Sequence, residues 1–129
     1  MDLKKFIGRQ QLSAMLQACD GEDGSFFRDM MSDLEKKIAA MPKTNEADGT
    51  PGKDFATLHY FMGGSDWWIV ERDMENEQRQ AFGFACLNGD AQNAEMGYIS
   101  IKELIENGVE LDLYYKQERI EDIRTRLGQ

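Results

Sequence analysis

The sequence is poor in the residues that build metal centres and covalent cross-links. Its 129 residues include one histidine and two cysteines, Cys19 and Cys86, which lie far apart and have no CxxC spacing. One imidazole and two remote thiols do not form a tetrahedral zinc set. Each cysteine lies within its own apolar pattern. We therefore expect reduced core thiols in a cytosolic protein, with no disulfide, metal or cofactor.

Long apolar runs are also missing. The N-terminus carries Lys4 and Lys5 but lacks the apolar stretch of a signal peptide. No run approaches the roughly 18 residues of a membrane helix. We therefore expect a cytoplasmic protein that is neither exported nor inserted into a membrane.

The common sequence signatures of catalysis and ion binding do not occur either. There is no GxSxG nucleophile elbow and no EF-hand calcium loop. The segment Gly63-Gly64-Ser65 precedes a predicted strand, whereas a phosphate-binding loop leads into a helix. The sequence thus predicts no catalytic residue.

Positive charge is scarce in the middle of the chain. The net charge is −9, from 15 Lys and Arg against 24 Asp and Glu, and residues 20–112 alone carry −12. Nucleic-acid binding needs cationic side chains that displace counterions from phosphates, so we expect no direct contact with DNA or RNA. An acidic surface fits a basic protein partner. The alternative is that the charge only keeps the domain soluble.

Residues 1–42 are predicted to form a pair of amphipathic helices. Apolar side chains recur at helical spacing in two stretches between residues 9 and 41, separated by the Gly- and Asp-rich run 20–24. Ser25 is the expected N-cap of the second helix, and Pro42 ends it. The apolar positions are Leu12, Met15, Leu16 and Cys19, then Phe27, Met30, Met31, Leu34, Ile38 and Met41.

Residues 43–54 have no periodicity and form the expected connector to a β-rich core at 55–115. Short polar links join the runs of this core, which indicates antiparallel neighbours. Ser100 and Glu103 make a capping box that begins a short helix. The predicted strands are Phe55–Met62, Trp67–Asp73, Gln80–Leu87, Glu95–Ser100 and Val109–Leu113.

Together these patterns predict one α+β domain over residues 1–129. The N-terminal helical pair packs on a mainly antiparallel sheet of about five strands. The short capped helix comes before the last strand, and a C-terminal helix closes the chain within 116–129.

The β-rich core also carries a family resemblance. The stretch Leu58–Trp68, with Glu71, Phe82-Gly83-Phe84 and Glu95–Ser100 after it, resembles an uncharacterised DUF-type family of small bacterial proteins. That family has the pattern aromatic-Gly-Gly-Ser-Asp-Trp, then Glu, then Phe-Gly, then Glu-aliphatic-Gly-Tyr-Ile-Ser, and the similarity spans about residues 55–115.

The resemblance implies a setting and no activity. Such proteins are carried on plasmids, phages and integrative elements, some as modules of large polyvalent proteins. Proteins of that setting often act against host defence systems, and several antirestriction and anti-CRISPR proteins are small and acidic. The expected function is therefore a non-enzymatic protein-interaction module that presents an acidic face to a basic partner.

Two hypotheses for the site follow. In the first, carboxylates on one exposed face bind the partner. In the second, a small hydrolase-like or ligand-binding domain uses His59 with Asp66 and Glu71 in a concave pocket; the structural alternative for His59 is a half-exposed strand residue. The candidate binding residues of the first hypothesis are Asp66, Trp67, Asp73, Glu75, Glu77, Glu110 and Asp112.

Overall fold

A computed structural model of the chain describes residues 2–44 and 54–129. Its helices are α1 (Arg9–Cys19), α2 (Gly24–Ala40), α3 (Ile101–Glu106) and α4 (Ile120–Arg126), with short 3-10 turns at Leu3–Lys5 and Ala91–Asn93. Its strands are β1 (Phe55–Ala56), β2 (Leu58–Met62), β3 (Ser65–Glu71), β4 (Ala81–Cys86), β5 (Glu95–Ile99), β6 (Glu110–Leu111) and β7 (Glu118–Arg119).

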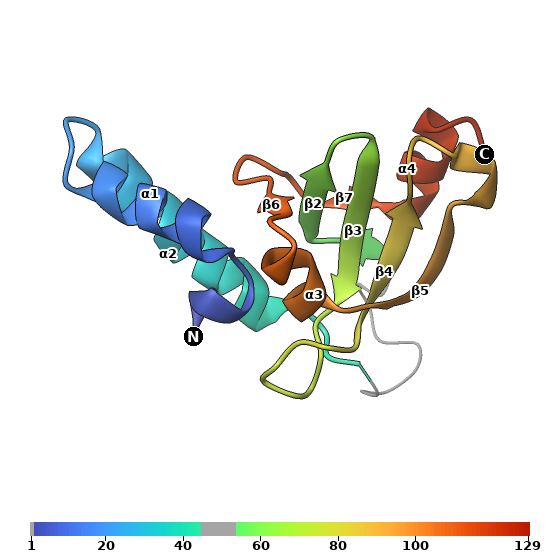
Figure 1. Cartoon of the computed structure of the whole chain (residues 1–129), viewed down its shortest axis with the longest axis horizontal. Helices are drawn as coiled ribbons and strands as arrows, with labels where there is room; N and C mark the ends of the chain where they lie inside the picture. Colours follow the sequence, from blue (N-terminus) through green and yellow to red (C-terminus); the bar gives the residue numbers. More distant parts are fainter. Residues whose placement is uncertain (1, 45–53) are drawn as a thin grey trace.

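Five strands form an antiparallel sheet in the order β5-β4-β3-β2-β6, and β1 pairs with β7 in a separate two-stranded ribbon (Figure 1). The predicted α+β architecture is confirmed, with the helical pair first, the capped helix α3 before β6 and a helix at the C-terminus. The turn between β2 and β3 is Gly63-Gly64, because Met62 pairs with Ser65. Strand β3 therefore begins at Ser65, two residues before the predicted start at Trp67. Gly63 has a φ of +57°, which a two-residue hairpin turn requires.

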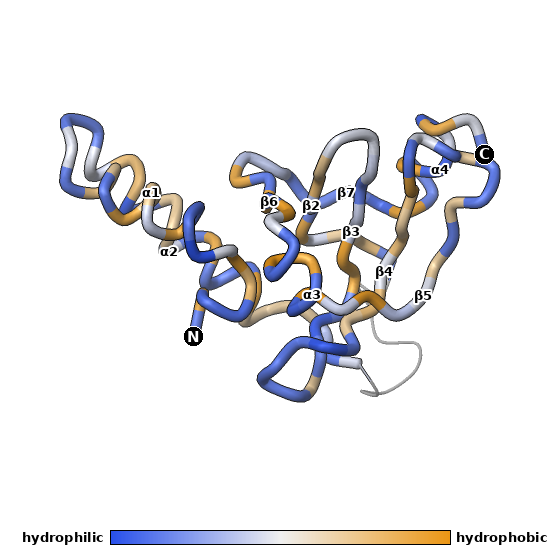
Figure 2. The backbone as a smooth tube through the Cα atoms, in the orientation of Figure 1, coloured by the Kyte–Doolittle hydropathy of each residue, from blue (hydrophilic) through white to orange (hydrophobic). Residues whose placement is uncertain are grey.

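Helices α1 and α2 form a hairpin, here called the helical arm, which projects from the sheet (Figure 1). The sheet end of the arm packs on one face of the sheet and forms a hydrophobic cluster with it, here called the first core. In this core, Leu34 and Ile38 of the arm contact the cluster that includes Leu58 and Ile69 of the sheet. The outer end is hydrophilic at its tip (Figure 2). The predicted cap is wrong: Asp23, not Ser25, holds the N-cap position of α2, because the helix already begins at Gly24.

A second core lies on the opposite face of the sheet, under α4. Trp68, Val70 and Phe84 of the sheet pack there with Ile120 and Ile123 of the helix. The sheet end of the helical arm and α3 therefore pack on one face of the sheet, and α4 packs on part of the other. No helix among the described residues has the length and apolar character needed to span a bilayer.

The C-terminal part departs from the prediction in two places. The expected helix from residue 116 begins only at Ile120, because Glu118 and Arg119 are extended and pair with β1. The expected strand Val109–Leu113 is reduced to β6, because the Asp112 carboxylate accepts the amide of Tyr114 at 3.1 Å and turns the chain.

Most of the expected connector, residues 45–53, lies outside the described part of the chain. Its start is ordered against the sheet. Thr44 is buried, and its amide donates to the carbonyl of Arg72 at 2.8 Å.

Candidate functional site

Two rows of side chains cross the sheet on the α4 face. Residues directly opposite each other on neighbouring strands point to the same face. One row runs from Glu110 through Phe61 and Asp66 to Cys86. The next runs from His59 through Trp68 to Phe84. The first row thus places Glu110 and Asp66 on either side of an aromatic ring.

His59 is the centre of this arrangement. Its Nε2 lies 2.8 Å from Asp66 Oδ1, and its Nδ1 lies 3.3 Å from Asp112 Oδ2. An imidazolium donates hydrogen bonds to both carboxylates, whereas a neutral ring has only one N–H to donate. The ring stacks on Trp68, with centroids 5.1 Å apart, and the side chain is 16% exposed. We call His59, Phe61, Asp66, Glu110 and Asp112 the histidine patch.

A polar network borders the patch on the side of β7 and α4. The ring of Tyr115 lies 5.4 Å from that of His59, and burial raises the pKa of its hydroxyl. Arg126 pairs with Glu118, and this hydrogen bond lowers the pKa of the Glu118 carboxyl. Arg124 lies over the ring of Phe84, 4.8 Å from its centroid. Sequence analysis did not select these four residues.

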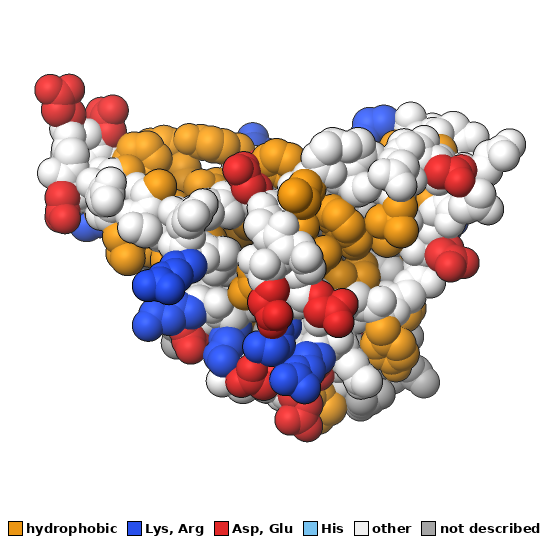
Figure 3. Space-filling view, viewed as in Figure 1, with side chains coloured by type: hydrophobic (Ala, Val, Ile, Leu, Met, Phe, Trp, Pro, Cys, Tyr) orange, Lys and Arg blue, Asp and Glu red, His pale blue; other side chains and the backbone are white. Residues whose placement is uncertain are grey.

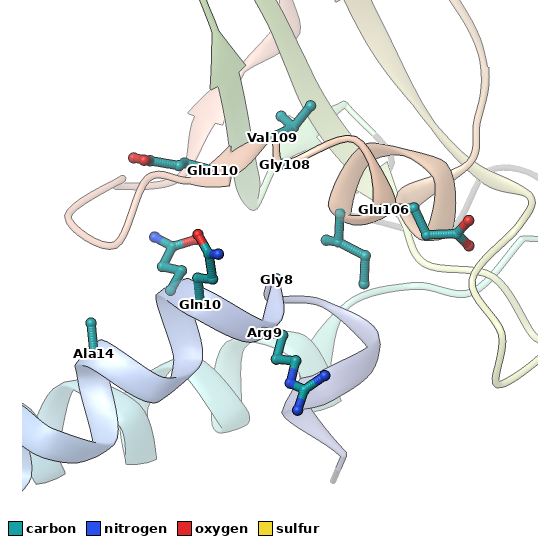
Figure 4. A pocket seen from close by; sticks show the side chains of 10 residues that line it. Gly8, Arg9, Gln10, Ala14, Glu106, Gly108, Val109 and Glu110 are labelled. Atoms are coloured by element: carbon teal, nitrogen blue, oxygen red, sulfur yellow. The ribbon is translucent and has the colours of Figure 1, made fainter.

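Glu110 lies on β6, an edge strand of the sheet. It lines one wall of a cavity of about 600 Å³ between the start of α1 and the turn from α3 to β6. Figure 4 shows Glu110 and Gln10 on one side of this cavity, with Glu106 on the other. Glu110 is exposed, so its carboxylate extends the charge of the patch toward the helical arm.

The loop between β3 and β4 does not supply the expected carboxylates. Asp73 is 4% exposed, and its carboxylate accepts the amides of Glu75 and Gln80 at 3.0 and 2.9 Å. The prediction that Asp73 faces a partner is therefore wrong, because this side chain organises the loop from inside. Glu75 is exposed. Glu77 pairs with Lys5 at 2.9 Å and Lys102 at 3.7 Å, which compensates its charge.

Two further candidate residues lie away from the histidine patch. Trp67 is on the opposite face of the sheet, half-buried against the first core. Glu71 follows an irregularity in β3 and pairs with Phe82 of β4. It lies three residues after Trp68, the residue of β3 that pairs with His59. The structure therefore unites His59 with Asp66 but not with Glu71.

The ion pairs of Glu77 predict an acid-dependent contribution to stability. The hydrogen bond from Lys5 lowers the pKa of Glu77 from its ordinary value of 4.5, and the charge of Lys102 acts in the same direction. A carboxylate with a lowered folded-state pKa stabilises the protein above its unfolded-state pKa, and this contribution is lost as the pH falls through the folded-state value.

We expect Glu77→Gln to lower the free energy of unfolding at pH 7 and to flatten its decline below about pH 4.5. Urea denaturation at pH 7 and pH 3 measures both effects. Glu75→Gln, an exposed carboxylate of the same loop, is the matched control. An identical acid dependence for Glu77→Gln and the parent chain contradicts the prediction.

Comparison of the chain with protein-family models, with curated proteins and with solved structures finds no match. The geometry of the histidine patch and the charge of the chain are therefore the basis for a functional proposal.

Proposed function

We propose that the chain is a non-enzymatic interaction module that binds a basic protein through the histidine patch. One observation carries the proposal: Asp66, Glu110 and Asp112 lie on one face of the sheet around Phe61, a residue that is 38% exposed. An exposed aromatic ring surrounded by carboxylates fits a cationic protein surface, where the ring supplies buried contact area and the charges supply orientation and fast association.

The whole chain supports a cationic partner. Residues 20–112 carry −12, so the long-range field favours basic proteins over nucleic acids. Among basic partners we propose a nucleic-acid-binding enzyme, such as one of a host defence system. Such an enzyme has a cationic surface where it holds its own substrate.

The catalytic alternative has less support. A general base or acid needs a ring nitrogen that reaches the substrate, and both nitrogens of His59 face carboxylates of the chain itself. Glu71, the third residue of that hypothesis, lies outside the patch. The alternative retains only the pair of His59 and Asp66, which belongs to the histidine patch and contributes to its surface charge.

Chemical cross-linking capture from cells that express the chain, with identification by mass spectrometry, tests the proposal. The double variant Asp66→Asn/Glu110→Gln removes two charges from the patch and leaves Asp112, whose carboxylate also shapes the chain after β6. The control Glu22→Gln/Asp23→Asn removes two charges from the exposed tip of the helical arm.

We expect a partner with a basic surface that is released as the salt concentration rises, since exposed charge pairs are screened. The patch variant should lose this partner and the tip variant should keep it. Equal capture by the parent and the patch variant overturns the proposal, as does a captured partner without a basic surface.

A further inference from the structure

A groove separates the helical arm from the chain that follows β6. Its volume is about 510 Å³. Helix α2 forms one wall, and residues 112–116 form the other. Figure 3 shows the molecule hollowed between the arm and the sheet, with hydrophobic side chains along the arm's edge of the hollow. The groove therefore lies between two elements that are far apart in the sequence.

The floor and rims of the groove differ in character. Met30, Leu34, Leu58 and Leu113 supply apolar surface. Two aromatic side chains on opposite rims are exposed: Phe26 at 47% and Tyr114 at 68%. These two rings extend the apolar surface of the floor onto both rims, so a segment bound in the groove can bury them together with it.

The α2 wall is acidic toward the tip of the arm. Asp29 and Asp33 are one helical turn apart and line the groove together. Like charges at this spacing disfavour a helix, and neither carboxylate forms an ion pair with another described residue. At the sheet end, Lys37 donates to the carbonyl of Tyr115 at 3.4 Å and Lys116 also lines the groove.

We infer that this groove binds a segment of the basic partner in which cationic side chains alternate with apolar ones. The cationic groups pair with Asp29 and Asp33, and the apolar groups contact Met30 and the rim aromatics. The inference rests on the proposed function and adds a second contact to the histidine patch. The two surfaces meet at Asp112, which contacts His59 and also lines the groove.

The length of the groove sets the size of the segment. Phe26 and Lys37 are eleven residues apart on α2, a span of about 16 Å at the helical rise. An extended chain covers that distance with about five residues. A peptide somewhat longer than this fills the groove without requiring the rest of the partner.

The test uses a fluorescein-labelled peptide of nine residues that alternates arginine and leucine, titrated with the full chain by fluorescence anisotropy. We expect Asp29→Asn/Asp33→Asn to raise the Kd at least about tenfold at low salt, because two direct charge pairs are lost. The tip variant Glu22→Gln/Asp23→Asn removes the same charge from the same arm and should change the Kd less than about twofold. A peptide that alternates arginine and serine should bind more weakly than the first.

Three outcomes overturn the inference, and they are distinguishable. If only Asp66→Asn/Glu110→Gln weakens the peptide, the segment binds at the histidine patch and the proposed function stands without the groove. If all three double variants weaken it equally, net charge alone attracts the peptide and neither surface is specific. If the serine peptide binds as well as the leucine peptide, the apolar floor makes no contact.

Discussion

Replacement of Trp68 by alanine is expected to lower the free energy of unfolding by about 3–5 kcal/mol. Trp68 is 4% exposed and belongs to the second core, where its ring lies 5.9 Å from that of Phe84 and 5.1 Å from that of His59. Its truncation leaves a cavity between the sheet and α4 and removes the ring on which the imidazole stacks. Urea denaturation followed by circular dichroism measures the loss.

Trp67→Ala is the matched control for this experiment. Trp67 is adjacent in the sequence, points to the opposite face of β3 and is only partly buried against the first core. Its loss should cost less, because a half-buried ring removes less apolar surface from water on folding. A Trp68→Ala chain within about 1 kcal/mol of the parent, the range of an ordinary substitution, contradicts the packing of the second core.

A methyl group added at Gly83 is expected to destabilise the protein by about 3 kcal/mol, the upper end of the usual cost of overpacking. The Cβ of an alanine at this position clashes with the backbone oxygen of Trp68 and lies 3.0 Å from the Cα of Ile69. The obstacle is backbone of the neighbouring strand, which cannot rotate away as a side chain does. Relief requires β3 and β4 to separate and weakens their ladder.

Gly97 provides a close control for Gly83. The two glycines face each other across β4 and β5, and among the described residues, apart from its chain neighbours, no atom lies within 4 Å of a Cβ added at Gly97. Gly97→Ala should therefore be neutral or stabilising by up to about 1 kcal/mol, because alanine reduces the freedom of the unfolded chain. Equal midpoints for the two alanine variants in thermal or urea denaturation contradict the close approach of the strands at Gly83.

The elements that the sequence predicted well are those determined by local signals. The helical arm follows from apolar spacing, and α3 follows from a serine whose side chain accepts the amide of Glu103 at 3.1 Å. Each of these signals lies within a few residues of the structure that it determines. The C-terminal helix was misplaced because Glu118 and Arg119 pair with β1, more than sixty residues earlier in the chain.

The candidate site was only partly predictable for the same reason. Alternation along Val109–Leu113 put Glu110 and Asp112 on one side of a strand, but no local pattern shows that β6 joins the sheet beside β2. That pairing is what brings both carboxylates to His59 and Asp66. The opposite error occurred at Asp73, since a polar run between strands predicts solvent exposure and does not reveal a carboxylate that caps two amides of its own loop.

The helical arm cannot complete its packing until most of the chain has been translated. The arm is synthesised before the sheet, and the surface that buries Leu34, Ile38 and Met41 is completed only by Leu104 and Leu111. Ribosomes add about 5–20 residues per second, so the arm waits roughly 4–14 s for the seventy residues that follow Met41. A chain that ends before β6 lacks Leu111, so the apolar side chains of the arm lose part of the surface that buries them.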